Sequence, residues 1–187
     1  MPASPPARRA DAERNRERIL AAARAGFAEP GAPLSMAEVA RRAGVGMATL
    51  YRNFPGRRDL LEALYTDQVD AVCAAATSVD GSPSDRFLAW VHHFASFIAS
   101  KHEIAAELLT QAEGPGPVLD RSRERVLAAG RPLLATAQDA GEIRRDLSLE
   151  QVLDMVIAVS AIHGDPDYSR PILTTALDGL RVGGSLR

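Results

Sequence analysis

The sequence predicts an all-α protein. After Asp11, apolar residues recur at helical spacing, and Gly, Pro and Ser interrupt them. No alternation of apolar and polar residues is long enough to indicate a sheet. Hydrophobic residues make up 46% and charged residues 25% of the 187 residues, which is typical of a globular chain that can bury a sizeable core. We expect about nine helices.

The first helix is expected to run from about Asp11 to Glu29. Apolar residues recur at helical spacing along this segment. Pro30-Gly31-Ala32-Pro33 then ends the helix, because proline and glycine interrupt helical structure. Residues 1–10, which are rich in Pro, Ala and Arg, are expected to form a disordered basic tail.

Two shorter helices follow. Ser35 begins a capping box with Glu38, so the second helix is expected from Ser35 to about Ala43. Gly44 suits the left-handed position that often follows the end of a helix. After a short connection, a third helix is expected over residues 47–53.

Longer helices make up the rest of the chain. We expect them at about residues 57–77, 83–100, 101–113, 118–140, 148–162 and 168–181. The helix at 83–100 carries aromatic residues on a face too broad for one exposed amphipathic stripe, which predicts a central place in the fold. Gly130-Arg131-Pro132 predicts an irregularity in the helix at 118–140, and Ser148 opens a second capping box with Gln151.

Charge is divided unevenly along the chain. Residues 1–60 hold 11 arginines and 6 acidic residues, whereas residues 61–187 hold 11 basic and 18 acidic residues. A basic segment joined to an acidic one favours a polyanionic partner at one end only. Chance clustering of solvated charges explains this feature equally well, so the motif in the basic segment has to decide.

That motif is a helix-turn-helix between Ser35 and Phe54. Small or apolar residues stand where its two helices must pack closely, namely Val39, Ala40, Ala43, Val45 and Leu50. Gly44 permits the tight turn. The second helix of the motif begins at Gly46, where no bulky side chain blocks its backbone N–H groups from a phosphate.

The segment LSMAEVARRAGVGMATLYRNFPGRRDLLEAL resembles the DNA-binding domain of the TetR/AcrR family of bacterial repressors. The resemblance covers about residues 12–65 and rests on Ala43-Gly44-Val45, Thr49-Leu50-Tyr51, Phe54-Pro55 and Leu60-Leu61. It implies a helix-turn-helix domain at residues 11–56 and a C-terminal ligand-binding and dimerisation domain at residues 57–187. The chain departs from the family at Gly46, where serine is frequent, and at Arg57-Arg58, where a lysine and an acidic residue are frequent.

The resemblance also implies which residues meet DNA. Met47, Ala48 and Thr49 would face base edges, and Tyr51, Arg52 and Arg57 would hold phosphates. The complete expected set is Ser35, Gly46, Met47, Ala48, Thr49, Tyr51, Arg52 and Arg57. The alternative is that Tyr51 belongs to the core and the arginines are merely solvated.

The helix at 83–100 carries most of the candidate ligand-binding residues. The set is Trp90, His93, Phe94 and Phe97, with Gln111 beyond this helix. His93 lies among aromatic residues and could orient a ligand, although a histidine at such a place more often finds its partner within the core. The four histidines form no HxxxH pair and have no cysteine nearby in sequence, so we expect no metal site and no cofactor.

The last two helices are more apolar than a terminal helix pair requires. In the resembling family, such a pair forms a four-helix bundle between two subunits, and reading a palindromic operator requires a two-fold dimer. The expected interface residues are Val152, Val156, Val159, Leu173, Leu177 and Leu180. Packing within a single subunit is the alternative.

Other functional classes find little support. No Gly-rich phosphate loop or G-x-S-x-G elbow is present, so we expect no enzyme. No apolar run approaches the roughly 20 residues that a membrane span requires, and the N-terminus lacks the apolar core of a signal peptide. With Cys73 as the single cysteine, these features predict a cytoplasmic protein.

The resemblance therefore implies a homodimeric transcriptional repressor that binds double-stranded DNA. Its operator would be an inverted repeat, from which an unknown small-molecule effector releases it. Two alternatives remain open. One is a constitutive repressor or architectural DNA-binding protein without a ligand, and the other is a helical interaction protein without DNA affinity.

Overall fold

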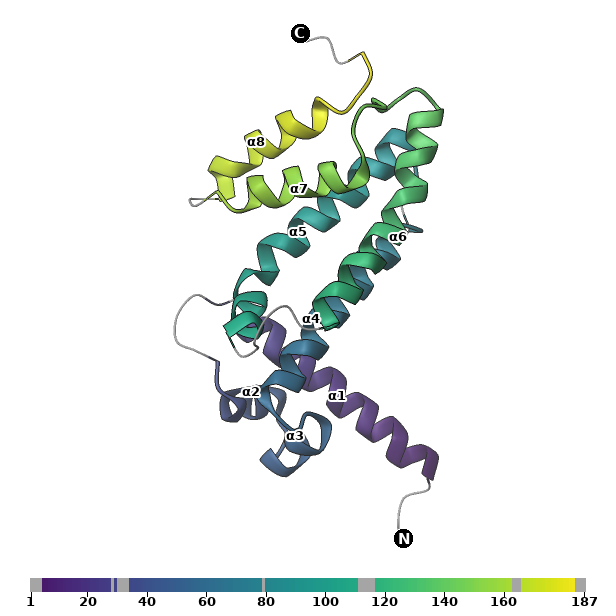
Figure 1. The fold of residues 1–187 in the computed structure, drawn as a ribbon. Coiled ribbons are helices and arrows are strands. Elements are labelled where there is room, and N and C mark those ends of the chain that lie inside the picture. The colour runs from purple at the N-terminus through teal and green to yellow at the C-terminus, as the bar shows by residue number, and fades with distance from the viewer. Residues whose placement is uncertain are drawn as a thin grey trace. The chain divides into compact units, whose positions relative to one another are not determined.

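A computed structural model shows that the fold is all-helical, as predicted (Figure 1). It describes residues 5–27, 29, 34–78, 80–110, 117–162 and 166–183, and these contain eight helices and no strand. The helices are α1 (Pro5–Phe27), α2 (Met36–Ala43), α3 (Met47–Asn53), α4 (Arg57–Ala75), α5 (Pro83–Thr110), α6 (Pro117–Asp139), α7 (Leu149–Ser160) and α8 (Pro166–Asp178).

Two helix boundaries differ from the prediction. The expected helices at 83–100 and 101–113 are one helix, α5, because no glycine or proline interrupts the chain after Pro83 until Thr110 has been passed. This accounts for eight helices instead of about nine. Helix α1 begins at Pro5, so residues 5–10 form its first turns instead of a tail. Proline is tolerated in the first turn of a helix, and the alanines and arginines that follow favour helix.

The chain divides into two compact units. The first unit comprises residues 1–67 with 103–114, and the second comprises residues 68–102 with 115–187. Helices α4 and α5 each run through both units, since the divisions fall after Asp67 and after His102.

The core of the first unit joins α1, α2 and α3. Ile19 and Ala23 of α1, Val39 of α2 and Leu50 of α3 are almost completely buried, as is Phe54 directly after α3. Gly44 ends α2 with φ 61°, a left-handed conformation that glycine adopts without the steric cost of a side chain. The predicted helix-turn-helix is therefore present, with a tight turn between two helices that share one core.

The core of the second unit is built around Trp90. This side chain is completely buried, its Nε1 donates to the Val72 carbonyl at 3.0 Å, and its ring stacks with those of Phe87 and Phe94. A Cβ on Gly130 would lie 2.2 Å from the Trp90 ring, so α6 can approach α5 this closely only with glycine at that position. Helix α6 continues past Pro132 to Asp139, so the segment Gly130-Arg131-Pro132 does not interrupt the helix. What this segment provides instead is the close contact between Gly130 and Trp90.

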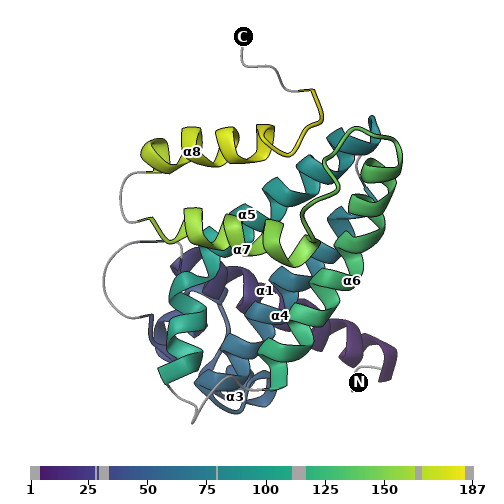
Figure 2. The same ribbon diagram turned by 45° about the horizontal axis from the view of Figure 1, so that its top comes forward.

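Helices α7 and α8 lie side by side in both orientations (Figures 1 and 2). Ser148 caps α7 with the full capping box that the sequence predicts, since Gln151 also accepts from the Ser148 backbone N–H. After α8, an isolated antiparallel bridge pairs Arg181 with Ile143, and this ties the end of the described chain to the connection before α7. In the part of the chain that the structure describes, no helix is both long and apolar enough to cross a membrane.

Candidate nucleic-acid interface

The first helix of the motif has only half of the predicted capping box. The Ser35 side chain accepts from the Glu38 backbone N–H at 3.2 Å, as expected for an N-cap. The Glu38 carboxylate is engaged by Arg41 and Arg42 and is not part of a reciprocal bond to Ser35. Cations one turn along the helix thus compete successfully for the acid.

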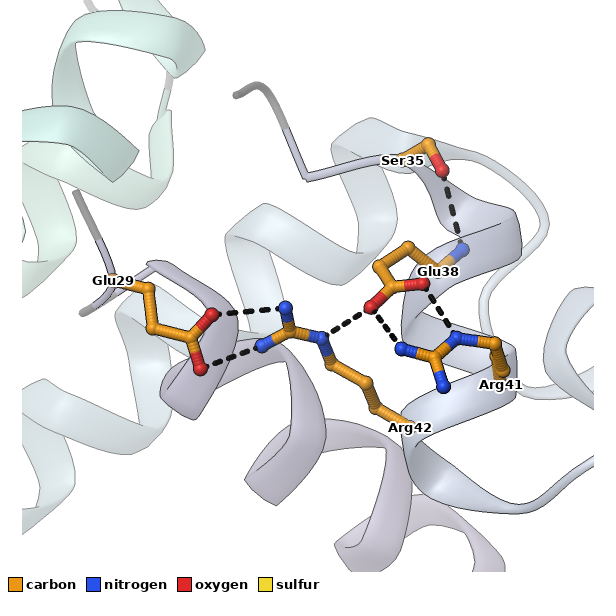
Figure 3. Close-up of polar contacts among 5 residues, drawn as sticks. All are labelled: Glu29, Ser35, Glu38, Arg41 and Arg42. Carbon is orange, nitrogen blue, oxygen red and sulfur yellow. Dashed lines mark hydrogen bonds and ion pairs between the residues drawn. The ribbon is translucent and has the colours of Figure 1, made fainter. Parts of the chain in front are cut away.

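These groups form a network of two glutamates and two arginines (Figure 3). Arg41 donates two hydrogen bonds to Glu38, at 2.7 and 2.8 Å. Arg42 donates through Nε to Glu38 at 2.6 Å and through both Nη atoms to Glu29 at 2.9 Å. The hydrogen bonds from Arg41 and then Arg42 lower the pKa of Glu38 to about 2. The network as a whole carries no net charge at neutral pH.

Helix α3 presents one exposed face. Met47 is 39% and Tyr51 46% exposed, and Ala48 and Arg52 are also exposed. Positions four residues apart on a helix lie on the same side, so these four residues form one surface. On the opposite side, Leu50 is completely buried.

The remaining expected DNA-binding residues of this motif differ in accessibility. Thr49 is half-buried, and its hydroxyl accepts from Arg52 Nη2 at 2.9 Å. Gly46 is the N-cap of α3 and makes no side-chain cap, and a Cβ placed there would meet no atom within 4 Å. Ser35 is exposed at the start of the motif. Three expected base-facing residues are therefore unequal, with Met47 and Ala48 open to solvent and Thr49 only partly so.

Arg57 has an internal role that the sequence did not reveal. Its side chain is half-buried, it donates to the Leu34 carbonyl, and its guanidinium lies 5.7 Å from the centroid of the Phe27 ring. Hydrogen bonding to a carbonyl and attraction to an aromatic face both stabilise a guanidinium that has lost water. Arg57 thus joins the start of α4 to the ends of the segment between α1 and α2.

Two arginines of α1 lie against the motif and were not among the expected site residues. Arg16 lies 4.7 Å from the centroid of the Phe54 ring, and Arg18 donates to the Gly44 carbonyl at 3.2 Å. Their place on a basic helix directly before the motif was the available signal. It could not show that both reach the turn and the end of α3, because that depends on how α1 crosses the motif.

The expected ligand-binding residues separate into two groups. Trp90 and Phe94 belong to the core of the second unit. His93 and Phe97 line a pocket of about 210 Å³ with Gln68, Ala71, Val72 and Ser96. A larger pocket, of about 450 Å³, lies elsewhere in this unit among α4, α5 and α6. Gln111 lies outside the described residues. Among the residues described, no group of three or more His, Cys, Asp or Glu side chains could hold a metal ion.

The expected dimer residues are largely internal. Val152, Val156, Leu177 and Leu180 are each at most 2% exposed, and Val159 and Leu173 are half-buried. The exposed apolar residues of the helix pair occupy other positions, namely Ile157, Ile162, Tyr168 and Ile172. Val156 and Ile157 show the cause, because a change of one residue turns a side chain by about 100° around a helix. The apolar content was therefore recognised, but the outward-facing side was not.

Two family models match the chain. Residues 19–64 match the model of bacterial regulatory proteins of the tetR family. Residues 82–182 match the model of the C-terminal domain of SbtR-like transcriptional regulators. No curated protein matches.

Solved structures are similar over most of the chain. A TetR transcriptional regulator from Streptomyces coelicolor, SCO0520, has 31% identity and a TM-score of 0.75, over 90% of this chain and 99% of that one. A TetR transcription regulatory protein from Mycobacterium vanbaalenii has 30% identity and a TM-score of 0.73, over 93% and 99%. The fold also matches the transcriptional regulator FadR from Bacillus subtilis in complex with stearoyl-CoA, at 18% identity and a TM-score of 0.61, over 91% and 99%.

Proposed function

The chain belongs to the TetR family of transcriptional regulators, and from that premise we propose that it is a homodimeric repressor released from an inverted-repeat operator by a small-molecule effector. Membership of this family makes it a DNA-binding regulator and not an enzyme. Repression, release by an effector and action in the cytoplasm are the parts that we add.

The observation that carries the proposal is the exposed face of α3. Met47 and Tyr51 are large apolar side chains, and a short helix does not normally leave two of them in water on the same side. Beside them, Ala48 leaves room for a close approach and Arg52 supplies a cation. A major groove offers thymine methyl groups to Met47 and phosphates to Tyr51 and Arg52.

The second unit supports the remaining parts of the proposal. Helices α7 and α8 leave Ile157, Ile162, Tyr168 and Ile172 exposed, which suits a contact with a second copy. The pocket of about 450 Å³ offers a place for an effector, and a FadR chain of this fold has been observed with stearoyl-CoA. Because α4 runs through both units, it is the candidate lever by which a bound effector changes DNA affinity.

The test is selection of DNA ligands from a random duplex library by the purified full-length protein. We expect an inverted repeat whose half-site centres lie about 34–36 Å apart, or a small multiple of that distance. Met47→Ala should alter the selected half-site, whereas Thr174→Ala, an exposed position on α8, should leave it unchanged. Selection of no sequence, or of a single asymmetric site, would contradict the proposal.

A further inference from the structure

The larger pocket of the second unit lies among the end of α4, the start of α5 and the middle of α6. Its volume of about 450 Å³ falls within the range of small-molecule sites, whereas the pocket at His93, at about 210 Å³, falls below that range. Most of its wall is apolar, from alanine, proline and leucine side chains. Its polar lining residues are Cys73, Thr77, Arg86 and Thr136.

Arg86 is the feature that sets this pocket apart. The side chain is half-buried, and its Nε atom is buried with no hydrogen-bond partner among the described residues. Two other half-buried arginines, Arg16 and Arg57, each lie over an aromatic ring. Burying part of a guanidinium without a partner is unfavourable, so the side chain would gain from an anion.

The other polar groups of the pocket do not supply that anion. The Thr77 hydroxyl donates to the Ala74 carbonyl at 3.0 Å, and the Thr136 hydroxyl donates to the Pro132 carbonyl at 2.7 Å. Burial raises the pKa of the Cys73 thiol, so this group is neutral at neutral pH. None of the described lining residues is acidic.

Two of the acids near the start of α5 already have partners. Asp85 is paired with Arg181 at 2.9 Å, and Glu142 accepts from the Ser84 backbone N–H at 2.7 Å. The described lining of the pocket therefore holds one cation without a partner among the described residues, Arg86, beside an apolar wall.

We propose that this pocket binds a small organic anion, with its carboxylate on Arg86 and its apolar body against the α6 wall of Ala128, Ala129 and Leu133. A carboxylate and a guanidinium can form two parallel hydrogen bonds, which gives both affinity and orientation. The proposal names the chemical class of the effector and, for its effect on DNA only, rests on the function proposed above.

The test compares two carboxylates with their uncharged amides. Octanoate against octanamide, and 1-naphthylacetate against 1-naphthylacetamide, are titrated into the full-length protein by calorimetry. Each carboxylate should bind at least about tenfold more tightly than its amide, because loss of the charge removes about 1.4 kcal/mol or more of attraction to Arg86. Arg86→Met should abolish this preference. Arg121→Met, which changes an exposed arginine of α6, should retain it.

Two further measurements guard against a variant that fails to fold. Ala128→Phe places a ring in the pocket from an exposed position and leaves Arg86 intact. It should therefore lower the affinity of the protein for both carboxylates. Arg86→Met should also raise the melting temperature of the ligand-free protein by about 2–4 °C, since an unpaired buried group is removed. Equal affinity for acids and amides, no binding of either acid, an unchanged preference in Arg86→Met or a lower melting temperature would each overturn the proposal.

DNA release is measured separately, by anisotropy of a labelled operator. Carboxylates that bind through Arg86 should weaken operator binding over the concentration range set by their own affinity, and operator DNA should weaken carboxylate binding by the same factor. If they bind and DNA affinity is unchanged, the anion site stands and release by this class of effector is excluded. If neither carboxylate binds but another compound releases DNA, the proposed function stands and the anion site is excluded.

Discussion

Two regions of the molecule leave large apolar side chains exposed, and they do so in different surroundings. On α3, Met47 and Tyr51 lie beside Arg52. On α7, on α8 and directly after α7, four large apolar residues are exposed, and on α8 an ion pair joins Arg170 with Asp167. In the described chain, Val182 is the one large apolar residue that is exposed outside these two regions.

The difference lies in the kind of partner that each surface suits. On the α3 surface, Arg52 has no carboxylate partner among the described residues, which suits a polyanion with grooves. The α7–α8 surface exposes four large apolar residues, and its arginine, Arg170, is paired with Asp167, which suits another apolar protein surface. Exposure of apolar side chains alone does not distinguish the α3 surface from the α7–α8 surface. The charge beside the apolar side chains does.

The largest effect is expected when charged residues are introduced into the apolar α7–α8 surface. Ile157→Glu combined with Ile172→Glu should convert the dimer into a monomer and weaken operator binding by about 10²–10⁴-fold, because the two half-sites are no longer bound together. Light scattering and DNA anisotropy measure the two effects. Ala135→Glu, at an exposed position on α6, is the control and should change neither. A double variant that stays dimeric would show that the surface serves another purpose.

The two sides of α3 provide a second test. Leu50→Ala removes a completely buried side chain and should lower the free energy of unfolding by about 2–5 kcal/mol. Met47→Ala removes an exposed one and should leave thermal unfolding nearly unchanged. It should instead weaken operator binding by about 1–3 kcal/mol and leave non-specific binding unaffected. Loss of stability in Met47→Ala would mean that this side chain belongs to the core.

Variants of Arg52 and Arg57 test which of these two arginines contacts DNA and which stabilises the fold. Arg52→Ala should weaken binding to all DNA sequences and reduce the log–log salt slope by about one, as expected when one phosphate contact is lost. Arg57→Ala should lower thermal stability, because it removes the contacts with Leu34 and Phe27. If Arg57→Ala reduced the salt slope as strongly as Arg52→Ala did, its internal contacts would be compatible with a phosphate contact as well.

The smallest effect concerns the acid in the α2 network. The folded pKa of Glu38, about 2, is below its ordinary value of 4.5, so its contribution to stability is present above pH 4.5 and is lost as the pH falls towards 2. Glu38→Gln should therefore show a constant, small loss of melting temperature above pH 5 that disappears at lower pH. Because the side chain is about 30% exposed, solvent partly screens the pair and keeps the loss small. A difference that grows on acidification would contradict this assignment.

Local signals predicted most of the fold. Ser148 with Gln151 and Gly44 each act within one helix turn, and the structure has both as expected. The capping box at Ser35 failed in part because Arg41 and Arg42, residues of the same helix, hold Glu38. A four-residue pattern does not show which of several charged groups will bind the glutamate side chain.

The site was less predictable, because it depends on which side of a helix faces the core. Sequence spacing correctly identified α7 and α8 as apolar, yet Val156 faces inward and Ile157 outward. Similarly, nothing in the sequence near Arg57 shows that Phe27 and Leu34 come within reach. No sequence motif marked Arg86 as a binding residue. Only the three-dimensional structure shows that it lines a pocket and that its Nε is buried without a partner among the described residues.

The neutral network on α2 has a consequence for how quickly the protein searches a genome. Arg41 and Arg42 are held by Glu38 and Glu29, so they displace few counterions from a duplex of arbitrary sequence. Each phosphate contact forgone reduces the salt slope of non-specific binding by about 0.9. The residence time on wrong sites falls accordingly, and the protein can sample more of them per second. If α3 binds the operator as proposed, Glu29 and Glu38 favour a short dwell on bulk DNA and leave recognition to α3.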